Sequence, residues 1–299
     1  MAGTLFTGLC AFPLTPADSD GVVNTRAFAA LIDRLCVAGV DSIGILGSTG
    51  LYAYLDRAER VHAVHAAVEA VAGRVPLIVG IGALRTSWSV ELAREAERAG
   101  AQGLLLAPMS YTPLTVREVA GHYRAVAGAT ALPLCIYNNP GTTGFTFPDA
   151  LIGELAHVPG IAAIKMPLPE GDDFAGEIGR LRKLVPQGFR IGYSGDWGAA
   201  PSLLAGGAAW YSVVAGLLPV EALRMTRAAQ NGAAAETARL QAAFEPLWRL
   251  FQAHGSLRLM YGIAERLNLD VEEPPLPIQK VDAPTARALD AALDQLINA

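Results

Sequence analysis

The stretch VPLIVGIGALRTSWSVELAREAERAGAQGLLLAP, residues 75–108, decides the class of fold. It begins with an apolar run at 75–82, continues with an amphipathic helical pattern at 87–99, and ends in a second apolar run at 101–108. Both runs are continuously hydrophobic rather than alternating, which is typical of parallel strands buried on both faces. The stretch therefore predicts a strand, a helix and a second strand parallel to the first.

The same strand–helix unit recurs up to residue 230. Further apolar runs lie at 5–12, 40–46, 132–139, 161–167, 189–195 and 207–216, and further helical patterns at 24–38, 57–71, 115–127, 148–157, 173–184, 197–205 and 219–230. Eight such units predict an α/β fold of the (β/α)8 type, a TIM barrel. A doubly wound sheet is the alternative, but it would leave some of the eight strands unexplained.

The rest of the chain has helical patterns only. These lie at 233–252, 255–268 and 283–297. A proline-rich loop, EEPPLP at 272–277, precedes the last of them. We therefore expect a catalytic barrel over 1–231 and a C-terminal helical extension over 232–299 that packs on the barrel.

The composition limits the class of function. The chain has 299 residues, a net charge of −5, 52% hydrophobic and 17% charged residues, which excludes a disordered protein. A mildly acidic chain without a Lys/Arg run lacks the electrostatic footprint of a nucleic-acid binder. No membrane span and no signal peptide are expected. Cys10, Cys36 and Cys135 are widely spaced, which favours a reducing cytoplasm over a disulfide scaffold.

Lys165 is the most informative candidate for chemistry. In a barrel, functional residues lie at the carboxyl ends of strands and in the loops that follow. The chain has three lysines, and this one stands inside the apolar run IAAIKMP at 161–167. An ammonium there is costly to desolvate, so burial favours the neutral amine that attacks a ketone to form a Schiff base. The alternative is a lysine that extends from the strand end to solvent.

Tyr137 and the turn GSTG at 47–50 complete the candidate site. Tyr137 precedes Lys165 by one strand–helix unit, so both side chains reach one rim if both point inward. Its phenol could then transfer protons to and from the substrate oxygen. The turn offers two hydroxyls and accessible backbone N–H groups, which can bind a small carboxylate. Taken singly, each feature is also consistent with a strand-end tyrosine or an ordinary tight connection.

A metal site is the weaker alternative. His62 and His65 have helical spacing, with Glu69 one turn further on. A helix on the outside of a barrel lies far from its mouth, so we expect these side chains to form a solvated face. We therefore expect no metal and no cofactor.

Three motifs together resemble one family. GSTG at 47–50, YNNP at 137–140 and the strand-borne Lys165, in this order and spacing, resemble the dihydrodipicolinate synthase / N-acetylneuraminate lyase family of Schiff-base-forming lyases. The resemblance covers essentially the whole chain. It implies that a pyruvate-like 2-keto acid is held as an enamine, and that the protein forms a homotetramer made of two dimers.

The resemblance also implies the role of each matching residue. Lys165 corresponds to the Schiff-base lysine and Tyr137 to the catalytic tyrosine. Ser48, Thr49 and Gly50 correspond to the turn that binds the keto-acid carboxylate. Thr49 corresponds as well to the hydroxyl that relays protons toward Tyr137.

Several positions depart from the family pattern. Thr142 stands where the synthase has an arginine that grips the carboxylate of the second substrate. Ser110 stands where the inter-subunit relay tyrosine usually stands, and Tyr111, one residue later, is the candidate replacement. Asp196 and Tyr211 are expected to face the rim and bind substrate. The mouth is otherwise expected to be of low polarity, lined by Leu51, Tyr52, Met166, Trp197 and Tyr211.

We therefore expect a lyase that acts on pyruvate or a related 2-keto acid through a lysine Schiff base. Aldol addition to, or cleavage from, an uncharged or modestly polar aldehyde is the leading reaction. The alternatives are a 2-keto-3-deoxy sugar acid dehydratase, 4-hydroxy-tetrahydrodipicolinate synthase and, in a different class, a non-catalytic barrel that binds a keto acid. A metal-dependent class II aldolase is disfavoured, because no ligand cluster stands at the strand ends. The expected partners are small molecules, not nucleic acid or membrane.

Overall fold

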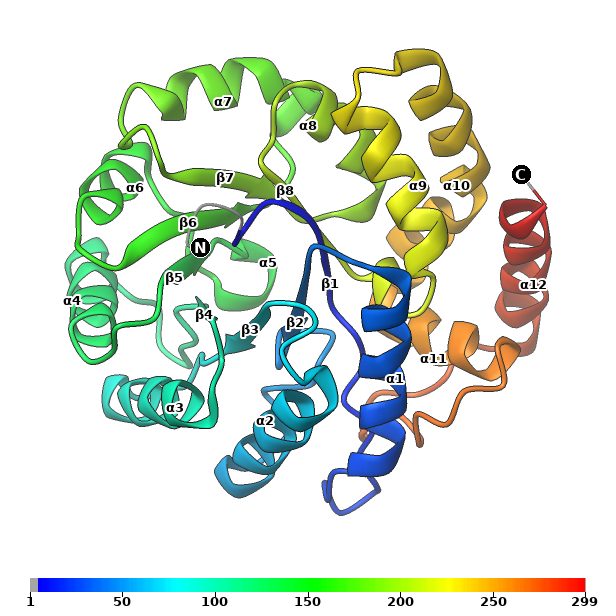
Figure 1. Cartoon of the computed structure of the whole chain (residues 1–299), viewed down its shortest axis with the longest axis horizontal. Coiled ribbons are helices and arrows are strands. Elements are labelled where there is room, and N and C mark those ends of the chain that lie inside the picture. Colours follow the sequence, from blue (N-terminus) through cyan, green and yellow to red (C-terminus); the bar gives the residue numbers. More distant parts are fainter. Residues whose placement is uncertain (1–4, 299) are drawn as a thin grey trace.

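Eight parallel strands close into a barrel in the computed structural model, which describes residues 5–298 (Figure 1). The strands are β1 (Gly8–Ala11), β2 (Ser42–Ile45), β3 (Leu77–Gly80), β4 (Gly103–Leu106), β5 (Leu134–Tyr137), β6 (Ile161–Met166), β7 (Arg190–Tyr193) and β8 (Ala209–Ser212). Strands that follow one another in the chain are neighbours in the barrel, and β8 pairs with β1 to close it. The prediction of a (β/α)8 barrel is confirmed, and the doubly wound alternative is wrong.

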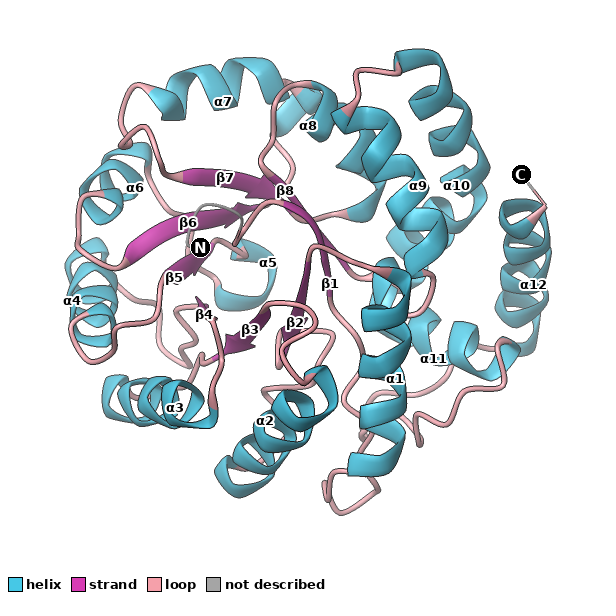
Figure 2. Ribbon diagram, in the orientation of Figure 1, coloured by secondary structure: helices cyan, strands magenta, loops and turns pink. Residues whose placement is uncertain are grey.

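Helices form a ring outside the strands (Figure 2). They are α1 (Thr25–Ala38), α2 (Arg57–Val71), α3 (Thr86–Ala99), α4 (Val116–Ala127), α6 (Asp149–Ala156), α7 (Phe174–Arg182), α8 (Ala199–Leu204) and α9 (Pro219–Gln230). The short helix α5 (Pro140–Thr143) lies inside this ring, next to β5. No pattern in the sequence predicts α5, because its four residues, PGTT, are too few to show a helical period. This helix directly follows the carboxyl end of β5 and so lies where the candidate site is expected.

The C-terminal extension consists of α10 (Ala234–His254), α11 (Ser256–Arg266) and α12 (Ala283–Ile297), which lie together on one side of the barrel (Figure 1). Helix α10 contacts α8 and α9. Its Gln241 also donates a hydrogen bond from Nε2 to the carbonyl oxygen of Trp197, at 2.9 Å, in the loop after β7. The extension is thus joined to a loop at the carboxyl end of the strands. Within residues 5–298, no helix is both long and apolar enough to cross a membrane.

Alternation along each strand separates two buried layers. Side chains on the outer face pack against the helices, whereas those on the inner face fill the barrel. Cys135 and Tyr137 of β5 and Ala163 of β6 belong to the inner layer. Because Lys165 follows Ala163 by two residues, it points to the same side. The period of the strand therefore places a lysine inside the barrel.

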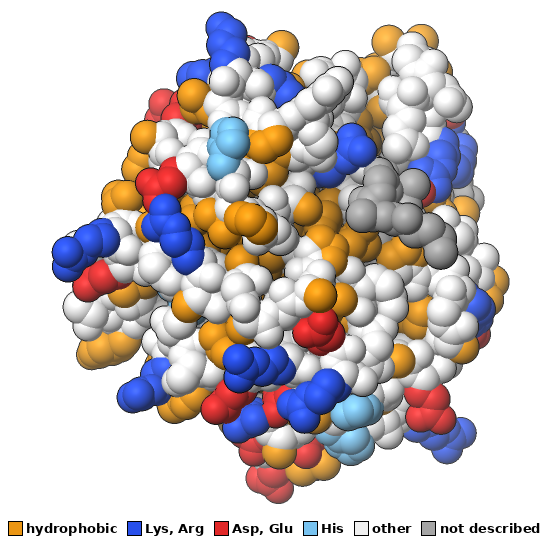
Figure 3. Space-filling model, turned by 60° about the vertical axis from the view of Figure 1, so that its left-hand side comes forward, with side chains coloured by type: hydrophobic (Ala, Val, Ile, Leu, Met, Phe, Trp, Pro, Cys, Tyr) orange, Lys and Arg blue, Asp and Glu red, His pale blue; other side chains and the backbone are white. Residues whose placement is uncertain are grey.

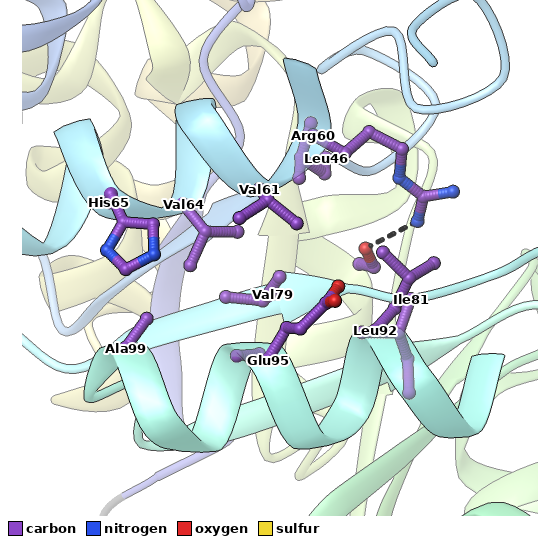
Figure 4. Close-up of a pocket in the computed structure, with 12 residues that line it drawn as sticks. Leu46, Arg60, Val61, Val64, His65, Val79, Ile81, Leu92, Glu95 and Ala99 are labelled. Atoms are coloured by element: carbon purple, nitrogen blue, oxygen red, sulfur yellow. Dashed lines mark hydrogen bonds between the residues drawn. The ribbon is translucent and has the colours of Figure 1, made fainter. Parts of the chain in front are cut away.

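A buried arginine fixes the carboxyl end of β3. Arg60 of α2 is only 6% exposed, and it lies between α2 and α3 over β3 (Figure 4). Its guanidinium donates to the carbonyl oxygens of Gly80, at 3.0 Å, and Gly82, at 2.9 Å. Burial lowers the pKa of Arg60 to about 10. The guanidinium also lies 5.6 Å from the ring centroid of Tyr52, which it holds in place at the mouth of the barrel.

The outer helices carry charges of both signs. Ion pairs link neighbouring helices, for example Arg124 of α4 with Glu154 of α6 and Arg180 of α7 with Asp149 of α6. On the face drawn in Figure 3, basic and acidic side chains are interspersed rather than gathered by sign. Exposed pairs of this kind contribute about 0–1 kcal/mol each. This surface therefore contributes more to solubility than to the stability of the fold.

The loop after β7 is held by a buried carboxylate. Asp196 is 2% exposed, and its Oδ1 accepts hydrogen bonds from Trp210 Nε1, at 2.9 Å, and from the N–H of Val213, at 3.1 Å. Its Oδ2 accepts from the N–H of Val214, at 2.8 Å. Burial raises the pKa of the Asp196 carboxyl, and the three donors and the nearby Lys165 oppose that shift. Asp196 thus ties the loop after β7 to the end of β8.

Replacing Asp196 with asparagine should destabilise the barrel. The amide group would place a donor against a backbone N–H, so we expect a loss of about 2–4 kcal/mol in the free energy of unfolding. Urea titration followed by circular dichroism measures it. A variant as stable as the wild type, with a raised KM for the second substrate, would instead support the sequence prediction that Asp196 binds substrate.

Candidate active site

The carboxyl ends of the strands open into a cavity of about 730 Å³. Residues from the barrel, from the loops and from the C-terminal helices line it. Lys165 and Tyr137 both face this cavity, and they are direct partners in the register of β5 and β6. The sequence prediction that the two side chains share one rim therefore agrees with the structure.

Lys165 lies among aromatic rings. The residue is 4% exposed, and Nζ lies 4.2 Å from the ring centroids of Phe12 and Tyr137 and 5.7 Å from that of Tyr211. No hydrogen bond or ion pair to Nζ occurs within the described part of the chain. Ring faces stabilise a cation only modestly, and they do not fix an amine as a carboxylate partner would. The amine is thus buried and free to reach a carbonyl carbon in the cavity.

The hydroxyl of Tyr137 has two polar neighbours. Ser48 Oγ lies 3.4 Å from it, and Asn139 Nδ2 donates to it at 2.9 Å. The resemblance assigned the relay hydroxyl to Thr49, but the structure gives Thr49 no hydrogen bond to Tyr137. The geometry favours Ser48 in that position. Thr49 is buried and lines the cavity beside it, which suits the carboxylate-binding role.

The turn at 47–50 holds both hydroxyls at the cavity. A Cβ on Gly50 would lie 2.6 Å from the backbone nitrogen of Leu46, so only glycine fits there. Thr15 Oγ1 donates to the carbonyl oxygen of Gly50 at 2.9 Å. Leu46 and Leu51, on either side, have φ angles of 54° and 61°. Such left-handed backbone in leucine is strained, and strain of this kind is common at functional sites.

Three residues expected at the mouth lie elsewhere. Tyr211 is 1% exposed, and its hydroxyl lies 3.5 Å from Cys135 Sγ, inside the barrel. Its side chain thus packs below Lys165 and does not line the cavity, nor do the buried Leu51 and Met166. Met166 follows Lys165 directly and so points to the opposite face of β6, toward the helices. A rim position for these residues is therefore a correction to the sequence analysis.

Asp196, Tyr52 and Trp197 do line the cavity. The carboxylate of Asp196, however, already accepts three hydrogen bonds from its own loop and β8. This arrangement favours a structural role over the predicted contact with substrate.

Ser110 and Tyr111 do not line the cavity of their own subunit. The hydroxyl of Ser110 donates to the carbonyl oxygen of Thr112. Tyr111 is 97% exposed, so its ring projects away from the protein. A relay role for Tyr111 would therefore require the cavity of another subunit.

Part of the cavity wall comes from residues that no sequence pattern indicates. Leu168 follows β6, whereas Phe251 and Leu257 come from the α10–α11 region of the extension. No local signal marks the last two residues, because the barrel rule points only to loops after strands. Asn139 was visible in the YNNP motif, but its side chain was not assigned a role.

The charge in the cavity is limited to Lys165 and Asp196 among the described lining residues. No arginine lines it, so a second carboxylate would meet no guanidinium there. Thr142 stands at its edge, as the motif predicts. Within residues 5–298, no group of three or more His, Cys, Asp or Glu side chains is arranged to bind a metal ion.

Comparison with known proteins agrees with this geometry. The chain is 33% identical over 296 residues to the 4-hydroxy-tetrahydrodipicolinate synthase of Thioalkalivibrio sulfidiphilus, covering 96% of this chain and 98% of the relative. It is 33% identical over 283 residues to the enzyme of that name from Methylococcus capsulatus, covering 94% and 95%. A crystal structure of a dihydrodipicolinate synthase from Agrobacterium tumefaciens superposes with a TM-score of 0.97 at 57% identity, covering 99% of this chain and 100% of that one.

The family-level match is equally extensive. The sequence model of the Dihydrodipicolinate synthetase family matches residues 5–296, which span the barrel and the helical extension. The chain therefore belongs to the dihydrodipicolinate synthetase family.

Proposed function

We propose that the protein is a class I lyase that holds pyruvate or a related 2-keto acid as an imine on Lys165. The observation that carries the proposal is the buried amine of Lys165, unpaired and beside Tyr137 at the base of the cavity. The leading reaction joins the keto acid to an uncharged or modestly polar aldehyde, or cleaves the product of that addition.

The first half of the reaction uses residues of the barrel. The keto-acid carboxylate binds at the turn of Ser48, Thr49 and Gly50. Nζ of Lys165 attacks the keto carbon to give a carbinolamine, and the Tyr137 hydroxyl passes a proton to the departing oxygen, which leaves as water. Loss of a proton from C3 of the imine then gives an enamine.

The second half depends on the far wall of the cavity. The enamine carbon attacks the aldehyde carbonyl carbon, a proton reaches the new alkoxide, and water hydrolyses the imine to free Lys165. Leu168, Trp197, Phe251 and Leu257 line this side. These apolar side chains lie in a cavity that Ser194 and Ser256 also line and that no arginine lines, which favours an uncharged or modestly polar aldehyde.

Three other functions are alternatives to this aldol reaction. Similarity to the two bacterial relatives described above favours 4-hydroxy-tetrahydrodipicolinate synthase. The same enamine could instead expel a hydroxyl group, as a 2-keto-3-deoxy sugar acid dehydratase requires. A non-catalytic barrel would bind a keto acid without forming an imine.

We also propose a homotetramer in the cytoplasm. Large apolar side chains are exposed at Leu84, 53%, and Trp88, 47%, which line one hollow, and at Tyr111, 97%. Contact with other subunits would remove these side chains from water. The three cysteines are free thiols, which suits a reducing compartment.

The imine can be trapped. Borohydride added with pyruvate should reduce the imine and add the mass of the reduced pyruvyl group to the peptide that contains Lys165, as read by mass spectrometry. Lys165→Ala should give no adduct and no turnover, whereas a folded Lys183→Ala control should behave as the wild type. An adduct that persists in Lys165→Ala would exclude the proposed mechanism.

Activity should not depend on a metal. The imine on Lys165 withdraws electrons from the keto-acid carbon, which is the role that a metal ion has in class II aldolases. Exhaustive chelation should therefore leave kcat within about twofold of its original value. The measurement is turnover before and after chelation. Loss of activity that a divalent ion restores would assign the enzyme to the other class of aldolases.

The second substrate should not need a carboxylate. At fixed pyruvate, we expect kcat/KM for aspartate semialdehyde to fall below that for uncharged aldehydes. Thr142→Arg should raise the value for aspartate semialdehyde by roughly tenfold or more, because a guanidinium forms charged hydrogen bonds with a carboxylate. Thr142→Gln, which adds a polar but uncharged side chain, serves as the control. Efficient wild-type turnover of aspartate semialdehyde, with no gain from arginine, would support the synthase alternative.

A further inference from the structure

The catalytic tyrosine has a hydrogen-bond donor within its own subunit. Asn139 follows Tyr137 by two residues, and its Nδ2 lies 2.9 Å from the phenolic oxygen. The side chain of Asn139 lines the same cavity as Lys165. The contact therefore lies beside the reacting atoms rather than on the outer surface of the loop.

The backbone of Asn139 is held firmly. Its carbonyl oxygen accepts hydrogen bonds from the N–H groups of Thr142, at 3.1 Å, and Thr143, at 3.0 Å, and from Thr143 Oγ1, at 2.9 Å. Helix α5 thus anchors Asn139 from its C-terminal side, and β5 anchors it from the other. The backbone that carries the side-chain amide is thus held in place without any substrate.

The direction of this hydrogen bond fixes the direction of the tyrosine proton. An amide nitrogen only donates, so the phenolic oxygen of Tyr137 accepts. The single proton of the phenol must then point elsewhere, toward Ser48 Oγ at 3.4 Å or toward a substrate oxygen. When Tyr137 gives up that proton, the N–H of Asn139 faces the oxygen that has become negative.

Residue 110, where the family resemblance implies a relay tyrosine from another subunit, is a serine. The hydroxyl of Ser110 donates a hydrogen bond to the carbonyl oxygen of Thr112. Tyr111 points outward and is 97% exposed. Within the described chain, Asn139 and Ser48 are the polar side chains that hydrogen-bond to the Tyr137 hydroxyl.

We propose that Asn139 is a positioning residue for Tyr137: its side-chain amide donates to the phenolic oxygen and so directs the phenol proton toward Ser48 Oγ or a substrate oxygen. The inference rests on the proposed imine mechanism, in which Tyr137 transfers protons. It assigns to the third residue of the YNNP motif a role in the rate of catalysis rather than in substrate binding.

Two substitutions at Asn139 distinguish the effect of its hydrogen-bond donor from the effect of its side-chain size. Asn139→Leu has a similar size and no donor, so kcat should fall by roughly 10- to 100-fold, a part of what a general acid–base contributes. KM for pyruvate should change by less than about threefold, because Asn139 is not assigned to the carboxylate. Asn231→Leu, an exposed asparagine after α9, is the matched control and should leave both constants unchanged.

Asn139→Asp reverses the polarity while keeping the shape. An ionised carboxylate accepts the proton of Tyr137 and turns it away from the substrate, so kcat at neutral pH should fall below that of Asn139→Leu. A protonated carboxyl donates again, and the ratio of Asn139→Asp to wild-type kcat should therefore rise as the pH falls toward about 4–5. A side chain with a merely structural role would not give this pH dependence.

The borohydride reaction keeps this inference separate from the proposed function. Both Asn139 variants should reach the wild-type amount of adduct on Lys165 at equilibrium, but more slowly. If the wild type gives no adduct, the imine mechanism fails and the inference fails with it. If all proteins give the adduct and Asn139→Leu turns over within twofold of the wild type, only the inference is overturned. A loss of kcat in Tyr111→Phe, with Asn139→Leu unaffected, would place the relay partner in another subunit.

Discussion

Burying the side chain of Lys165 inside an apolar barrel costs desolvation free energy, and the rest of the site depends on this burial. Lys165 is 4% exposed, and its amine is surrounded by the faces of aromatic rings rather than by a counter-ion. Water would stabilise the ammonium better than these rings do. The alternation along β6 leaves the side chain no other direction, because its neighbours Ile164 and Met166 occupy the outer face. The stability of the surrounding barrel therefore holds the amine in a poorly solvated position.

The remaining parts of the site are placed by the same regular geometry. The register of β5 and β6 sets Tyr137 directly opposite Lys165. The turn at 47–50 brings Ser48 to the tyrosine hydroxyl from β2, on another part of the barrel. The ends of β2, β5 and β6 thus contribute these three groups, and the closure of the barrel brings them together. The hydrogen-bonded strands position Lys165 and Tyr137, and the turns that follow β2 and β5 position Ser48 and Asn139.

The sequence predicts the barrel well, because strand and helix signals are local. The eight strands and the three C-terminal helices lie where their patterns indicate. Side-chain direction near a strand end is harder to predict, since a shift of one residue reverses the face. Met166 was therefore expected at the mouth but points toward the helices. Tyr211 does point into the barrel, but it does not line the cavity. Asp196 lies at the cavity, yet its carboxylate is engaged by β8 and the loop that follows it, a contact that no local pattern reveals.

The cavity is lined by two parts of the chain, the barrel and the C-terminal helical extension. Its base is made by strand ends of the barrel, whereas part of its far wall comes from Phe251 and Leu257, beyond the last strand. The bond from Gln241 to the carbonyl oxygen of Trp197 joins the two parts through the backbone of the barrel loop, so it does not depend on which side chain stands at that position. Mutations in the α10–α11 region can thus reshape the space for the second substrate while Lys165 and Tyr137 keep their positions. Relatives of this protein could diverge in the aldehyde they accept by changing a segment that takes no part in making the imine.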